Sequence, residues 1–134
     1  MENQFDQALE VDVLAAALRQ NNQESGDLLE FLSQKLEQSL PSNTTVTRTG
    51  WLLSKERPVQ KIVVDFEDYH YQISRQKNGT LSASVVKLGR GIVLKTTTIP
   101  VEQWINEIAQ EIVRFAQNSE QTRKALNRFV LGEF

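Results

Sequence analysis

Apolar residues recur at helical spacing near the beginning of the chain. Phe5, Leu9 and Val13 lie four residues apart, and this pattern predicts a helix over residues 4–19. After a short polar interruption, a second amphipathic stripe predicts a helix over residues 25–40, which a proline then ends.

The last third of the chain has the same helical period. A strong apolar stripe predicts a helix over residues 101–117. The stripe shifts near Asn118, which predicts a further helical segment over residues 119–131, either as a separate helix or as a bent continuation. The apolar residues of the first stripe are Val101, Trp104, Ile105, Ile108, Ile112 and Phe115.

Between these helices the apolar period changes to two, which is typical of half-buried β-strands. The predicted strands cover about residues 44–52, 60–66, 69–76, 80–87 and 92–98. Polar residues and glycines between them predict tight hairpin turns at residues 67–68, 77–79 and 89–90. The centre of the chain is therefore predicted to be an antiparallel meander.

The turns also predict which side chains share a face, because residues opposite each other in an antiparallel pair point to the same side. They place Val64 opposite Tyr71, Ile73 opposite Ala83 and Val85 opposite Leu94. The apolar face then holds Ile62, Val64, Phe66, Tyr69, Tyr71, Ile73, Leu81, Ala83, Val85 and Leu94. The other face holds Lys61, Val63, Asp65, His70, Gln72, Ser74, Ser82, Ser84, Val86, Val93, Lys95 and Thr97.

This order of elements predicts an α+β fold in two layers. An antiparallel β meander of about five strands would carry the N-terminal and C-terminal helices on its apolar face. The chain has 134 residues, of which 40% are hydrophobic and 24% charged, and these values fit one globular domain over residues 1–134.

Cysteine content and the N-terminus bear on the compartment. The sequence contains no cysteine, so disulfides and thiolate chemistry are excluded. Its first residues are acidic rather than basic, unlike a secretory signal, and no apolar stretch is long enough to cross a bilayer. We therefore expect a soluble cytoplasmic protein with no membrane partner.

Charge is divided along the chain. Residues 1–40 carry eight acidic and two basic residues, whereas residues 41–100 carry nine basic and four acidic ones. The basic residues of the middle region are Arg48, Lys55, Arg57, Lys61, Arg75, Lys77, Lys87, Arg90 and Lys95. They suggest nucleic-acid or other polyanion binding as an alternative function, although the exposed face lacks aromatic residues for stacking bases.

His70 is the only histidine and is predicted to lie opposite Asp65, near Ser82 and Ser84. These residue types are those of a hydrolase, which we rank third because a flat sheet offers neither a strained nucleophile turn nor an evident oxyanion hole. One histidine and no cysteine also give little support for a metal site. We predict no cofactor, no metal and no catalytic residues.

The leading hypothesis is a small non-enzymatic interaction or adaptor module that binds a protein partner or a second copy of itself. Binding would use the open sheet face, a sheet edge or the acidic pair of N-terminal helices. A dimer through the open face or through the charge division is one form of this hypothesis. The predicted binding residues lie on the exposed face and its loops: His70, Gln72, Ser82, Ser84, Val86, Arg90, Val93 and Lys95.

Overall fold

The computed structural model of the protein describes residues 11–18, 28–49 and 58–131. Several predictions lie outside these residues. They are both ends of the first predicted helix, the beginning of the second predicted helix, the end of the first predicted strand and the basic residues Lys55 and Arg57.

Helices form at both ends of the described chain, as their apolar stripes predict. Residues 11–18 are helical, and α2 spans Leu28–Ser39. Two further helices, α3 (Val101–Ala116) and α4 (Glu120–Leu131), follow the sheet, so the last segment is two helices rather than one bent helix. The hydroxyl of Ser119 accepts a hydrogen bond from the backbone N–H of Thr122, 3.2 Å away, and thereby caps the start of α4.

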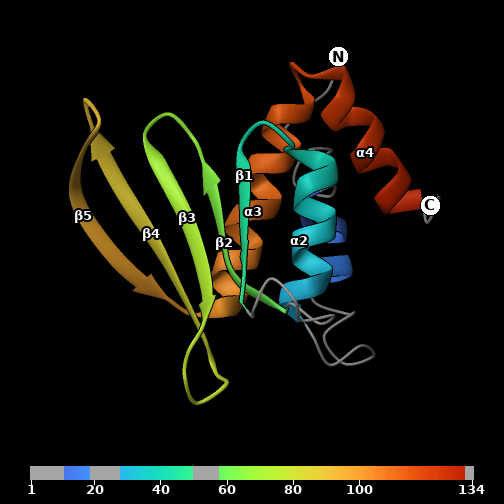
Figure 1. Ribbon diagram of the computed structural model, residues 1–134. Coiled ribbons are helices and arrows are strands. Elements are labelled where there is room, and N and C mark those ends of the chain that lie inside the picture. The colour runs from blue at the N-terminus through green and yellow to red at the C-terminus, as the bar shows by residue number, and fades with distance from the viewer. Residues whose placement is uncertain (1–10, 19–27, 50–57, 132–134) are drawn as a thin grey trace.

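The five strands form one antiparallel sheet in chain order (Figure 1). They are β1 (Thr44–Arg48), β2 (Val59–Asp65), β3 (Tyr69–Arg75), β4 (Leu81–Gly89) and β5 (Ile92–Ile99). Because the order is that of the chain, β1 and β5 are the two edges of the sheet.

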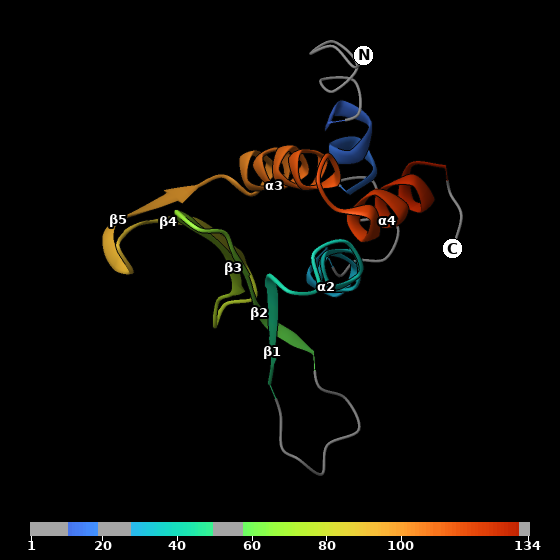
Figure 2. The ribbon, with the colours of Figure 1, turned by 90° about the horizontal axis from the view of Figure 1, so that it is seen from above.

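The helices pack on one face of the curved sheet, which confirms the predicted α+β class (Figure 2). Helix α2 contacts β1 and β2, whereas α3 contacts β3 and β4. The largest fully buried side chains are Trp104, Leu14, Leu18, Leu29, Leu32, Leu36, Leu40, Ile62, Ile73, Ile105, Ile108 and Ile112. They come from both layers, so the core lies between helices and sheet.

Two of the three predicted turns have the predicted register. The β2–β3 pairing places Val64 opposite Tyr71, and the β3–β4 pairing places Ile73 opposite Ala83. In the second turn, Gly79 has a φ of 88°, which is the left-handed conformation that a three-residue loop requires. Short-range turn chemistry was therefore sufficient to align β2, β3 and β4.

The third turn was predicted wrongly. Its central residues are Arg90 and Gly91, with φ values of 53° and 79°, rather than Gly89 and Arg90. Gly89 pairs with Ile92, and the register then shifts, so that Val85 lies opposite Thr97 instead of Leu94. Glycines at both 89 and 91 allow either turn, and positive φ at both central residues suits the twist of a two-residue hairpin.

This shift changes the predicted faces of β5. Lys95 and Thr97 pair with Lys87 and Val85, so they lie on the helix side of the sheet and not on the open face. Leu94 was predicted in the core but is 61% exposed, because the described helices contact β1 to β4 and none of them contacts β5 to a comparable extent. The extra residue in β5 is a β-bulge, which reverses the side-chain alternation along the strand.

Candidate interaction surface

β5 is an edge strand that projects beyond the helical layer. In Figure 1 it is the strand furthest from α2 and α4, and Figure 2 shows it extending past the end of α3. Because it is last in the sheet order, its outer backbone edge has no neighbouring strand among the described residues. An uncovered edge of this kind presents N–H and C=O groups that can accept another strand.

Apolar side chains are concentrated where this edge meets the hairpin turn. Ile92, Val93 and Leu94 are 66%, 59% and 61% exposed. Single exposed apolar residues are ordinary, but a consecutive group on an edge strand is a recognised feature of interaction sites. Of the predicted binding residues, Val93 is part of this group.

Three cations surround the apolar group. Lys87 and Lys95 lie directly opposite each other on β4 and β5, and Arg90 is in the turn. Like charges at directly opposed positions destabilise a strand pair. Residues 81–101 contain no acidic residue that would offset them. We call residues 87–97, with their exposed apolar residues and three cations, the β4–β5 arm.

The charges of the β4–β5 arm have no carboxylate partner in the part of the chain that the structure describes. Other predicted members of the basic surface are engaged elsewhere. Arg48 pairs with Glu30, and Arg75 donates hydrogen bonds to the carbonyl of Val59. The basic middle region is thus not one continuous surface, and three of its cations, Lys87, Arg90 and Lys95, lie together in the arm.

The open face of the sheet brings together the other predicted residues. His70 lies opposite Val86, Gln72 opposite Ser84, and Ser82 opposite Ser74. Polar and half-exposed residues surround Val86, yet Val86 itself is only 6% exposed. It therefore offers little apolar surface to a partner.

His70 has the carboxylate neighbour that its register predicts. Its Nε2 atom lies 3.3 Å from Oδ1 of Asp65. Within the described residues, however, no hydrogen bond joins His70 to Ser82 or Ser84. The pair resembles a cross-strand contact on a wet sheet face more than a base held against a nucleophile.

A cavity of about 320 Å³ lies between the β2–β3 turn and α3. It is lined by Phe66, Glu67, Asp68, Tyr69, Tyr71, Glu111 and Arg114. The hydroxyl of Tyr71 donates a hydrogen bond to Oε1 of Glu107, 2.9 Å away. Burial, and then this hydrogen bond and the charge of Glu107, raise the pKa of the Tyr71 hydroxyl above its ordinary value.

This raised pKa predicts a loss of stability in alkali. Below about pH 10 the tyrosine is neutral in both states, but above that pH the unfolded chain ionises while folded Tyr71 does not. Tyr71→Phe is expected to lower the free energy of unfolding by about 1–2 kcal/mol at pH 8 and by less at pH 11. Denaturant unfolding at both pH values measures this, with exposed Tyr69→Phe as control. If Tyr71→Phe lowered the free energy of unfolding equally at both pH values, the raised pKa of Tyr71 would be contradicted.

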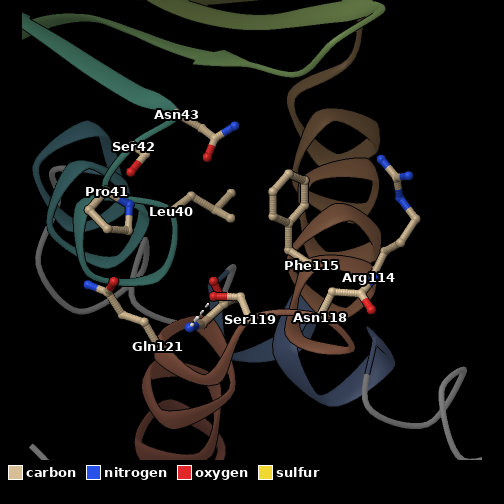
Figure 3. A pocket seen from close by; sticks show the side chains of 10 residues that line it. Leu40, Pro41, Ser42, Asn43, Arg114, Phe115, Asn118, Ser119 and Gln121 are labelled. Atoms are coloured by element: carbon tan, nitrogen blue, oxygen red, sulfur yellow. Dashed lines mark hydrogen bonds between the residues drawn. The ribbon is translucent and has the colours of Figure 1, made fainter.

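A larger cavity of about 420 Å³ lies where α2, α3 and α4 meet (Figure 3). Leu40 and Phe115 form its apolar walls, as the close view shows. Hydroxyl and amide side chains and Arg114 surround them, and the buried Thr122 hydroxyl donates to the carbonyl of Ser39, 2.8 Å away. Among the described residues that line the cavity there is no histidine or carboxylate.

Among the described residues no group of three or more histidine, cysteine, aspartate or glutamate side chains is placed to bind a metal ion. In the same part of the chain, every helix is too short or too polar to span a bilayer.

Comparison with protein-family models, with curated proteins and with solved structures gives no match to this chain. The surface itself is therefore the basis for a proposed function.

The residues predicted from the sequence to bind a partner include Arg90, Val93 and Lys95 of the arm, but not the other members of the same surface. Lys87 was treated only as part of the basic region, and Leu94 was placed in the core. Ile92 received no role. The run of three apolar residues directly after a glycine-rich turn was the available signal, because a hairpin tip is seldom covered by a helix.

Proposed function

We propose that the protein is a non-enzymatic interaction module that holds a protein partner at the β4–β5 arm. The observation that carries this proposal is the exposure of Ile92, Val93 and Leu94 on an edge strand that no described element covers. Such a surface supports strand addition, in which backbone hydrogen bonds give affinity and neighbouring side chains give specificity. Binding by the arm requires no catalytic group.

A photo-crosslinking amino acid at position 93 tests the proposal in cells that naturally make the protein. We expect a defined covalent adduct from position 93 and none from exposed Gln38 on α2, which serves as the control. The adduct mass distinguishes another protein from a second copy, and light scattering at low and moderate salt checks for a dimer. Equal, weak labelling at both positions would contradict the proposal.

Polyanion binding is a second candidate, supported by the directly opposed Lys87 and Lys95 and by Arg90 in the turn. It predicts retention on heparin that falls steeply as salt rises. Replacing these three residues by glutamate would abolish retention. Because no aromatic residue lies in the β4–β5 arm, base stacking contributes nothing there, and the candidate ranks second.

A further inference from the structure

We infer that the partner strand of the β4–β5 arm is an extended peptide segment of another protein in which acidic and aliphatic residues alternate. The inference rests on the proposed function and specifies the partner's chemistry. Three features support it: the free edge of β5, the distribution of side chains on its two faces, and the uncompensated positive charge of the arm.

The two faces of the arm differ in character. Lys87 and Lys95 are paired on the helix side of the sheet. On the open side, Leu88 pairs with Val93. A strand added to the outer edge of β5 also alternates its side chains between these two sides. Carboxylates on one side would lie near the lysines, and aliphatic side chains on the other would lie near Val93.

Charge favours an acidic occupant. Lys87 and Lys95 repel each other across the strand pair, and Arg90 adds a third cation in the turn. Carboxylates beside them would reduce this repulsion and would also exclude basic partners. The lysines are exposed, so each pairing contributes modestly, and the affinity is expected to depend on salt.

A second copy of the same strand fits less well. β5 contains no acidic residue, so pairing β5 with β5 brings further lysines to the helix side. With Thr96 on the two-fold axis, Lys95 of each copy would lie diagonally across from Lys95 of the other. Self-pairing thus adds to the repulsion that an acidic strand removes.

The test uses the full chain and a fluorescein-labelled heptapeptide of alternating glutamate and valine, followed by fluorescence anisotropy. Lys87→Glu with Lys95→Glu is expected to weaken binding at least about tenfold. A peptide with lysine in place of glutamate should bind the reversed variant and not the wild type. The double variant keeps like charges opposite each other, so it should fold as the wild type does, which circular dichroism checks.

A matched control reverses two lysines outside the arm, Lys61→Glu with Lys77→Glu, and should leave the affinity unchanged. Backbone pairing is tested with peptides that are N-methylated on all glutamates or on all valines. Because successive N–H groups of a strand point to opposite edges, one of these peptides should lose binding and the other should retain it. Binding that survives both methylations would overturn strand addition.

The remaining outcomes separate this inference from the proposed function. If position 93 gives an adduct with another protein but the acidic peptide does not bind, the inference fails and the proposed function stands. An adduct with a second copy likewise overturns the acidic-strand inference. Displacement of the peptide by single-stranded oligonucleotides, together with insensitivity to N-methylation, would overturn it in favour of a polyanion site.

Discussion

Trp104→Ala is expected to lower the free energy of unfolding by about 3–5 kcal/mol. Trp104 is fully buried in α3, and its ring packs edge-on against Tyr71 with the centroids 6.4 Å apart. The substitution leaves a cavity between α3 and the sheet, where the surrounding residues relax only partly. Urea unfolding followed by circular dichroism measures the change, since a complete domain commonly has about 5–15 kcal/mol of stability.

Trp104→Phe is the matched comparison, because it keeps an aromatic ring and removes the indole N–H. That N–H is buried, and no hydrogen-bond partner for it exists among the described residues. Because this variant removes an unsatisfied donor, part of the lost packing energy is offset. We therefore expect the free energy of unfolding to fall by at most about 2 kcal/mol. A phenylalanine variant as unstable as the alanine variant would contradict this account of the N–H.

Glu30→Ala is expected to lower the free energy of unfolding by about 2 kcal/mol. The carboxylate of Glu30, on α2, accepts a hydrogen bond from the backbone N–H of Val59 at 2.9 Å, where β2 begins. It also accepts hydrogen bonds from Arg48, at the end of β1, at 3.2 Å. Glu30 therefore joins α2 to two adjacent strands. Denaturant unfolding at neutral pH measures the loss.

Two variants identify which of these contacts matters. Glu30→Gln retains an acceptor for the Val59 N–H and is expected to lose about 1 kcal/mol. Arg48→Ala removes the exposed Arg48–Glu30 ion pair, which is worth at most about 1 kcal/mol, and leaves the contact between Glu30 and the Val59 N–H in place. If Arg48→Ala were as destabilising as Glu30→Ala, the ion pair rather than the backbone contact would carry the effect.

The register of the β4–β5 hairpin could not be predicted from the local sequence. For the turns before Tyr69 and before Leu81, the predicted loop lengths place apolar residues together on both strands, and the structure has those registers. At the third turn, Gly89 and Gly91 permit two loops, and the strand that follows has apolar and polar residues on both faces. Alternation therefore could not choose between them.

The candidate surface was only partly accessible to sequence reasoning. His70, Gln72, Ser82, Ser84 and Val86 share the predicted open face. The predicted binding residues lie on the open face and its loops, but among the described residues the consecutive exposed apolar side chains lie at the tip of β5. The exposure of a strand's side chains depends on which helices lie over it. Helix α3 follows β5 in the chain but packs over β3 and β4.

The sequence by itself determined the elements, the meander and the alignment of β2 with β3 and β4. These follow from side-chain periodicity and turn chemistry, which act over a few residues. Only the tertiary structure decided the β5 register, its bulge and the packing of the described helix α3 over β3 and β4 rather than over β5. Those features depend on packing between segments far apart in the chain. The same packing leaves β5 uncovered and makes the β4–β5 arm available to a partner.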